Sequence, residues 1–190
     1  MTKAPTRERL LDTAAEFFYR DGVHIGIDAL CKAAGVSKRS MYQLFDTKDE
    51  VMAASLDRIA ADYETRLLPP AGDGRSHYER VLYVFEQLDA ASETDTYRGC
   101  PFVSTAFELK DPEHPASVVA RRHKQSLTDF FQREAEQAGI ADADLLAIQL
   151  TMVFDGAGAR VVVRAEPLRG MARRTAEAVL TASGWNGGGQ

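Results

Sequence analysis

The segment from Ile27 to Asp49 has the pattern of two short helices joined by a tight turn, and it constrains the fold more than any other part of the chain. Before the turn, apolar residues recur at i, i+3, i+4 and i+7, which marks one buried face of a helix. These residues are Ile27, Leu30, Cys31 and Ala34. Gly35 is expected to end this helix, because glycine takes the left-handed conformation without steric cost. Ser37 is a favourable N-cap for the second helix, and Val36 can fill the angle between the two.

The second helix is expected to bury Met41, Leu44 and Phe45 and to expose a polar face. Between Gly35 and Phe45 there are two cations, four hydroxyl or amide side chains and no carboxylate. Such a face suits the major groove of DNA, where Arg and Lys reach guanine edges or phosphates and Gln can pair with adenine. The alternative is an ordinary helical hairpin with a basic surface, since short helix-turn-helix patterns also arise by chance.

We assign predicted roles to the individual DNA-binding side chains. Arg39 and Gln43 are predicted to read bases, and Lys38 can serve bases or phosphates. The predicted phosphate contacts are Ser37, Ser40, Tyr42 and Lys48. Lys48 stands in the first turn of the next helix, which Asp46 or Thr47 can cap, and there the helix N-terminus and the cation could hold one phosphate together.

The quoted stretch and its flanks resemble a known family. RERLLDTAAEFFYRDG, followed by IDALCKAAGVSKRSMYQLFDTKDEVM, is similar to the N-terminal domain of the tetracycline-repressor (TetR) family of transcriptional regulators. The matching residues are Arg9, Leu10, Leu11, Ala14, Phe17, Phe18, Gly22, Ala34, Gly35, Val36, Ser37, Tyr42, Phe45 and Lys48. A weaker likeness to one branch of the family's C-terminal domains continues at GCPFVSTAFELKDPEHP. The resemblance implies a homodimer that binds a palindromic operator and releases it when a small molecule enters the C-terminal domain.

Three positions depart from the family pattern. The loop between Gly22 and Ile27 looks one residue shorter than usual. Before Ile27, where the family often has Thr or Ser, this chain has Ile25-Gly26, so a phosphate contact there could come only from a backbone N–H. Leu44 stands where the family often has His, and we expect it to pack inside.

Over the whole chain, helix formers dominate and strand signals are scarce, so we predict an all-α fold. We place a three-helix DNA-binding domain at residues 1–47, a helical effector-binding and dimerisation domain at 48–184, and a tail at 185–190. Helix 143–165 is apolar nearly all round and therefore needs cover on most sides, while 167–183 keeps one apolar stripe. We expect these two helices to form a homodimer interface; the alternative is that both are core of a monomer.

Aromatic side chains of the C-terminal part could line a cavity for a small-molecule effector of unknown identity, with His123 or Asp155 as polar groups. The predicted lining residues are Tyr63, Tyr83, Phe85, Phe102, Phe107, His123, Phe130, Phe154 and Asp155. The alternative for each is a plain core residue, and the sequence leaves both roles open.

The charge distribution is compatible with DNA as a partner. The formal net charge is −5, but the segment from Lys32 to Lys48 carries four cations against Asp46 alone. A local basic patch on an acidic body suits a protein that binds one short site and does not coat DNA at random.

The sequence gives little support for other functions. We predict no catalytic residue, metal site or cofactor, because the four histidines lack a metal-binding spacing and the glycine pair after Asp155 lies in a helix pattern. Cys31 and Cys100 form no disulfide or metal pattern; we expect Cys31 to be buried, and a redox role for Cys100 stays open. Without a membrane span or signal peptide, the expected location is the cytoplasm. The alternatives to a regulator are a helical protein-interaction module without DNA specificity and, with no feature in its favour, an enzyme.

Overall fold

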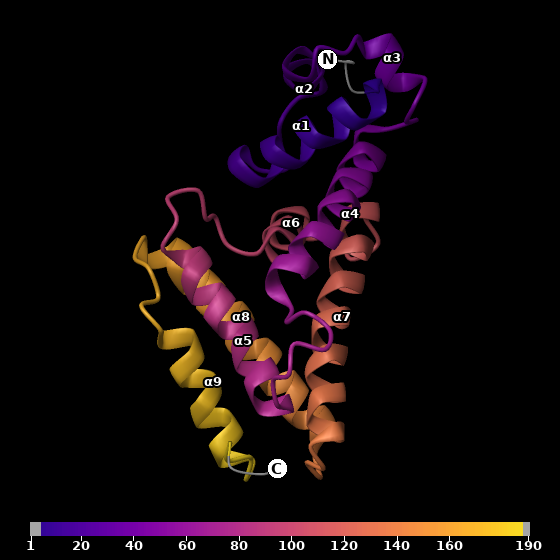
Figure 1. The fold of residues 1–190 in the computed structure, drawn as a ribbon. Coiled ribbons are helices and arrows are strands. Elements are labelled where there is room, and N and C mark those ends of the chain that lie inside the picture. Colours follow the sequence, from indigo (N-terminus) through magenta and orange to yellow (C-terminus); the bar gives the residue numbers. More distant parts are fainter. Residues whose placement is uncertain (1–4, 188–190) are drawn as a thin grey trace. The chain divides into compact units, whose positions relative to one another are not determined.

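The computed structural model describes residues 5–187, and within this range it contains helices and no strand (Figure 1). The all-α prediction is therefore confirmed. In chain order the helices are α1 (Thr6–Asp21), α2 (Ile27–Ala34), α3 (Lys38–Tyr42), α4 (Lys48–Leu67), α5 (His77–Ser92), α6 (Pro101–Leu109), α7 (Pro115–Gln137), α8 (Ala143–Arg164) and α9 (Met171–Ala182). The last residues of the predicted tail, 188–190, lie outside the described residues.

Packing divides the chain into two compact units. The first unit comprises Met1–Ala61 and Pro101–His123, and the second comprises Asp62–Cys100 and Lys124–Gln190. Helices α4 and α7 contribute residues to both units. The ranges 1–47 and 48–184 describe expected functions of the chain and stay a prediction.

The core of the first unit is built from one apolar face of each short helix. Helix α1 buries Leu10, Leu11, Ala14 and Phe18. They share a cluster with Leu30 of α2 and Met41 of α3, both with no exposed surface. Because α2 and α3 each have only one such face, the opposite face stays in solvent. This packing fixes the motif helices against α1 and the start of α4.

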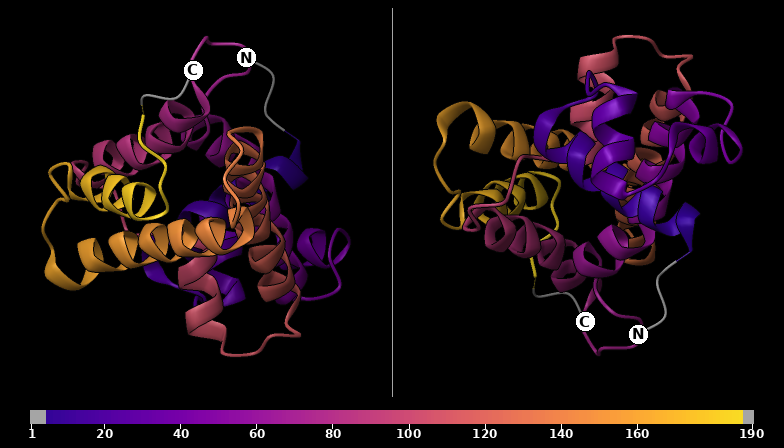
Figure 2. Two further views of the ribbon diagram at one scale, coloured as in Figure 1. Left: turned by 90° about the horizontal axis from the view of Figure 1, so that it is seen from below. Right: turned by 90° about the horizontal axis from the view of Figure 1, so that it is seen from above.

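The core of the second unit contains a group of packed aromatic rings among aliphatic side chains. Phe85 of α5 stacks on Phe131 of α7 with ring centroids 5.6 Å apart, and it meets Phe154 of α8 edge-on at 6.3 Å. Helix α9 lies beside α5 and α8, and Figure 2 shows these three helices together. Aromatic pairs in such arrangements contribute about 0.5–1.5 kcal/mol beyond their buried area.

The C-terminal end differs from the prediction in two respects. The last helix begins at Met171 and not at residue 167, because Ala165, Arg169 and Gly170 have positive φ angles that turn the backbone. Trp185, placed in the tail by the sequence, is only 7% exposed and meets the ring of Tyr78 edge-on at 5.9 Å. Its indole therefore belongs to the core of the second unit.

Helix α8 has one face in the core and one face that the single chain leaves uncovered. Its exposed apolar residues define what we call the α8 apolar face: Leu145, Ile148, Met152, Val162 and Val163. Length and composition alone would also allow α8 to cross a membrane, although the sequence predicted no span. Core helices of soluble proteins meet the same criterion, and α8 buries Leu146, Leu150 and Phe154.

Candidate nucleic-acid interface

The turn between α2 and α3 has the predicted geometry. Gly35 is left-handed, with φ 61° and ψ 39°, and the Val36 N–H donates to the Cys31 carbonyl at 2.9 Å. The Ser37 Oγ accepts the N–H of Ser40 at 3.0 Å and so caps α3. The glycine corner and the serine cap are confirmed, and together they fix the angle at which α3 leaves α2.

Residues Ser37–Leu44, which we call the recognition segment, present most of the predicted DNA-binding side chains to solvent. Ser37, Lys38, Arg39, Tyr42 and Gln43 are exposed; Ser40 and Lys48 are half-buried. Met41 and Phe45 are buried, as predicted.

The prediction that Leu44 packs inside is wrong, since its side chain is 39% exposed. Helix α3 ends at Tyr42, and the Leu44 N–H bonds the Met41 carbonyl three residues back at 2.9 Å. A three-residue bond winds the chain more tightly than an α-helix. Leu44 therefore lies in the turn that follows α3, where the Phe45 N–H also bonds the Met41 carbonyl at 2.9 Å, and the residue spacing of a continued α-helix does not predict the position of its side chain.

The two cations of the recognition segment have different surroundings. Lys38 pairs with Asp28 of α2 at 2.7 Å, and this hydrogen bond raises the pKa of Lys38 above its usual value. Arg39 has no carboxylate partner among residues 5–187. Asp28 lies outside the segment that we read as carboxylate-free, so that face has one acidic neighbour. Arg39 is thus the cation of this segment whose charge is not paired with a carboxylate of the described residues.

Lys48 is anchored within the protein. Its Nζ donates to the Val23 carbonyl at 2.7 Å and lies 5.9 Å from the centroid of the Phe18 ring. The start of α4 is capped by Thr47, whose Oγ1 accepts the Glu50 N–H at 3.1 Å. A lysine has three N–H donors, so the bond to Val23 leaves donors for a phosphate.

Sequence reasoning missed Arg7, an exposed cation beside the end of the recognition segment. Its guanidinium lies 5.4 Å from the centroid of the Phe45 ring, a cation–π contact that restrains it. Arg7 stands in the first turn of α1, where a cation opposes the helix dipole. That mismatch is the sequence signal that could have marked it.

The predicted effector-lining residues of the second unit are mostly committed to packing. Phe85, Phe130 and Phe154 are at most 4% exposed and belong to one core cluster, which Tyr63 also contacts. The remaining two, Tyr83 and Asp155, face cations. The Tyr83 ring lies 4.5 Å from the Arg75 guanidinium, and Asp155 pairs with Lys124 at 2.5 Å.

The other three lie in the first unit. Phe102 stacks on His123 with ring centroids 5.0 Å apart, and His123 Nε2 lies 3.1 Å from Asp57 Oδ1. This contact, together with Arg122, lowers the pKa of Asp57. Phe107 is 70% exposed. The effector site stays a prediction.

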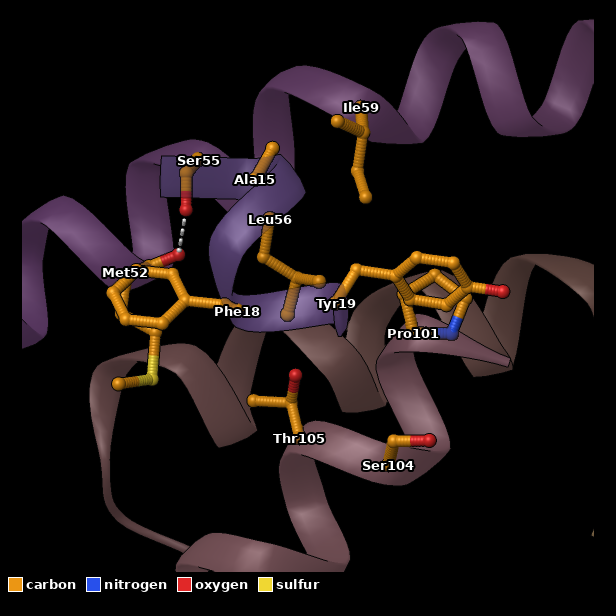
Figure 3. Close-up of a pocket in the computed structure, with 10 residues that line it drawn as sticks. All are labelled: Ala15, Phe18, Tyr19, Met52, Ser55, Leu56, Ile59, Pro101, Ser104 and Thr105. Carbon is orange, nitrogen blue, oxygen red and sulfur yellow. Dashed lines mark hydrogen bonds between the residues drawn. The ribbon is translucent and has the colours of Figure 1, made fainter. Parts of the chain in front are cut away.

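A small pocket of the first unit lies between α1, α4 and α6 (Figure 3). Its lining residues are Ala15, Phe18, Tyr19, Met52, Ser55, Leu56, Ile59, Pro101, Ser104 and Thr105. Its volume of about 20 Å³ has room for one water molecule and not for an effector. The only hydrogen bond drawn joins the Ser55 hydroxyl to the Met52 carbonyl at 2.9 Å. None of the predicted effector-lining residues takes part in it.

Two features that could support catalysis, a metal site and a reactive thiol at Cys31, are absent among residues 5–187. Within residues 5–187, no group of three or more His, Cys, Asp or Glu side chains could hold a metal ion. Cys31 is buried, as expected, and burial raises the pKa of its thiol. A thiol with a raised pKa is a poor nucleophile.

Comparison with known protein sequences points to one family. The family model of bacterial regulatory proteins of the tetR family matches residues 10–55. The chain is 33% identical over 113 residues to the HTH-type transcriptional repressor NemR of Escherichia coli, covering 58% of this chain and 57% of NemR. It is 26% identical over 103 residues to the HTH-type transcriptional regulator YjdC of Escherichia coli, covering 54% of each. The chain thus spans little more than half the length of these relatives.

Solved structures extend the likeness over the whole chain. A Streptomyces avermitilis protein assigned to the TetR transcriptional regulators is 51% identical, with a TM-score of 0.93 over 96% of this chain and 100% of that one. A TetR-family regulator from Streptomyces coelicolor is 26% identical, with a TM-score of 0.80 over 94% and 93%. Reduced Escherichia coli NemR, at 22% identity and a TM-score of 0.76 over 94% and 95%, shares the fold. The family model and the full-length match show that this chain belongs to the TetR family of bacterial regulatory proteins.

Proposed function

We propose that this protein is a homodimeric, cytoplasmic transcriptional repressor that binds a palindromic DNA operator and releases it when a small-molecule effector binds. The observation that carries the proposal is the recognition segment, a rigidly capped helix that exposes Arg39, Tyr42 and Gln43 without an acidic residue of its own. A helix of this kind can enter the major groove and place two or three side chains on base edges.

We infer the roles within each half-site from exposure and pairing. Arg39, with its charge unused, and Gln43 read bases, while Ser37, Ser40, Tyr42 and Lys48 contact phosphates. To contact DNA, Lys38 must share its ion pair with Asp28 or break it. An exposed ion pair of this kind contributes only about 0–1 kcal/mol. Arg7 adds a phosphate contact at the edge of the segment.

A second copy of the chain is the proposed partner of the α8 apolar face. Leu145, Ile148 and Met152 are 52%, 51% and 68% exposed, and they repeat at the three- and four-residue spacing of a helix seam. Met171 at the start of α9 is 50% exposed and could extend the same surface. Burying large apolar side chains between two copies is favourable at about 25 cal/mol per Å². A twofold axis would then present two recognition segments to successive major grooves, about 34–36 Å apart.

The effector is proposed only as a class, a small molecule that enters the helical C-terminal part. To release DNA it must bind the DNA-incompetent arrangement more tightly than the competent one. A tight ligand that leaves operator affinity unchanged is therefore not the effector.

Electrophoretic mobility shift across a series of salt concentrations tests the proposal against its rival, a helical module that binds protein and not DNA. We expect the affinity for duplex DNA to fall steeply with salt, because phosphate contacts release counterions. Absence of any salt-dependent shift would favour the protein-interaction module.

A further inference from the structure

We propose that Glu108 of α6 is a positioning residue for operator binding, which holds the turn between α1 and α2 so that α3 is presented in one orientation. The inference rests on the proposed function and concerns a residue outside the predicted DNA-binding surface. All residues involved belong to the first unit.

The peptide groups of Val23 are held from two sides by charged side chains. The Val23 N–H donates to Glu108 Oε2 at 2.8 Å, across 85 residues of sequence. The Val23 carbonyl accepts from Lys48 Nζ at 2.7 Å. The Val23 side chain is 3% exposed and lies in the same core cluster as Phe18 and Leu30. An anion from α6 and a cation from α4 therefore fix the backbone of one buried residue.

Gly22 makes room for this contact. Its φ of +88° favours glycine, and a Cβ atom at this position would lie 2.6 Å from Glu108 Oε2. Real Cβ atoms essentially never approach another atom so closely. The space beside the turn is thus occupied by the carboxylate, and Gly22 serves both the backbone conformation and the approach of Glu108.

Local helix electrostatics does not explain why a carboxylate lies there. Glu108 is the penultimate residue of α6, and Gly22 directly follows the last residue of α1. A negative charge at a helix C-terminus opposes the helix dipole, so both helix ends disfavour it. What the position gains is the bond to Val23, because a hydrogen bond to a charged group is stronger than one between neutral groups.

The held turn lies where it can orient the whole DNA-binding motif. Val23 stands four residues before the start of α2, and Lys48 begins α4, six residues after the end of α3. Through Val23, the two bonds therefore connect the turn before α2, the start of α4 and the end of α6. Without the Glu108 bond the turn would sample more conformations, and binding DNA would have to restrict them at a cost in affinity.

Four variants of the full-length protein, assayed on an operator recovered by selection from random duplexes, test the inference. Glu108→Ala removes the acceptor, Glu108→Asp keeps the charge but withdraws the carboxylate by one methylene, and Glu108→Gln keeps an acceptor oxygen without the charge. Glu113→Ala is the matched control, because Glu113 is exposed and its side chain has no partner in the described part of the chain.

We expect Glu108→Ala and Glu108→Asp to weaken operator affinity about tenfold or more, whereas Glu108→Gln stays within about threefold of the parent. Glu113→Ala should bind like the parent. The slope of log affinity against log salt should be unchanged in all four, because no phosphate contact is removed. Hydrogen exchange of the Val23 amide gives a readout without DNA: it should speed up about tenfold or more in the Ala and Asp variants and not in the Gln variant.

A double-mutant cycle with Gly22→Ala isolates the contact. The φ strain of alanine at position 22 is common to both backgrounds and cancels in the cycle. Gly22→Ala should therefore cost clearly less operator affinity in the Glu108→Ala background than in the parent, because the carboxylate that it displaces is already absent.

The outcomes separate this inference from the proposed function. If the parent binds no duplex in a salt-dependent manner, the proposed function fails. If the parent binds and Glu108→Ala binds equally well or more tightly, the positioning role is overturned while the function stands. Should Glu108→Ala not fold, Glu108→Asp carries the same test, and parental exchange at the Val23 amide in that variant would also overturn the inference.

Discussion

The recognition segment of the first unit and helix α8 of the second unit both leave large side chains in solvent, but with opposite chemistry. The recognition segment exposes Arg39, Tyr42 and Gln43, whose polar groups gain from hydrogen-bond partners on another molecule. Helix α8 exposes Ile148, Met152 and Val163, whose only gain is removal from water.

The contrast indicates the kind of partner that suits each surface. A polar, cation-bearing face is well solvated in the unbound protein and can bind its ligand reversibly. A large exposed apolar face favours association and is usually covered by a partner. The first is suited to a reversible complex with DNA and the second to a lasting contact between two copies. Substitutions in the two regions should therefore impair the protein in different ways.

Charge on the α8 apolar face should have the largest effect. We expect Met152→Asp to convert the dimer to a monomer and to lower operator affinity at least about a hundredfold, because an unpaired carboxylate in an apolar interface costs several kcal/mol. Sedimentation equilibrium and operator titration measure the two effects. Val118→Asp, which makes the same kind of change at an apolar residue that is 44% exposed on α7, is the control and should remain dimeric. A dimeric Met152→Asp variant would show that another surface forms the dimer.

Loss of the buried carboxylate Asp89 should come next and should affect folding and not DNA recognition itself. Asp89 of α5 accepts the N–H groups of Ala172 at 3.1 Å and Arg173 at 3.0 Å, and so caps α9 from a distance. We expect Asp89→Ala to lower the free energy of unfolding by about 2 kcal/mol, since two donors lose a charged acceptor. Urea denaturation measures this change. Asp89→Asn, which keeps one acceptor oxygen, should lose less.

Removal of the unpaired arginine should alter sequence choice more than stability. We expect Arg39→Ala to relax preference at one base pair of each half-site, at a cost of about 1–3 kcal/mol in operator binding. Titration of the operator and of single-base variants measures the loss. Arg121→Ala, at an exposed arginine of α7, is the control. An Arg39→Ala variant that discriminates bases as the parent does would remove Arg39 from base reading.

Lys48 should combine a phosphate contact with its structural bond. Lys48→Ala should weaken all duplexes alike and reduce the salt slope by about 1.8, because a dimer loses one phosphate contact in each half-site and each contact contributes about 0.9. A parental slope with weakened binding would mean that Lys48 acts only through the Val23 carbonyl. The slope therefore distinguishes the two roles of this side chain.

Acid should produce the smallest effect, and it should act on the first unit. Asp57 has a lowered pKa because of its bond to His123 and its contact with Arg122. A carboxylate with a lowered folded-state pKa stabilises the fold above its unfolded pKa of about 3.9, and this contribution is lost as pH falls through the folded-state value. Asp57 is half exposed, so we expect Asp57→Asn to remove less than about 1 kcal/mol at neutral pH and to make unfolding less sensitive to acid below pH of about 4. Chemical denaturation at a series of pH values checks this, and an Asp57→Asn variant with unchanged acid sensitivity would contradict it.

Local signals in the sequence were sufficient for most of the fold. The glycine corner at Gly35, the cap at Ser37 and the apolar face of α2 each depend on residues within one turn of each other, so pattern and spacing predict them. The uncovered face of α8 could also be anticipated, because a helix that is apolar all round exceeds what one chain can bury.

What the sequence did not show depends on contacts between distant residues. Three contacts each join segments that are far apart in the sequence: the bond from Glu108 to Val23, the cap that Asp89 provides for α9 and the cation–π contact of Arg7 with Phe45. No spacing rule reaches across such intervals. The exposure of Leu44 depends instead on the exact residue at which a short helix ends, which is the least predictable property of a helix.

The claim that two copies of this chain read a palindromic operator is best tested by selection of bound sites from random duplex DNA with the purified protein. The claim predicts enrichment of one inverted repeat whose half-site centres are about one helical turn apart, and a complex that contains two copies of the chain. Recovery of no preferred duplex, or of a single unrepeated site bound by one copy, would contradict it.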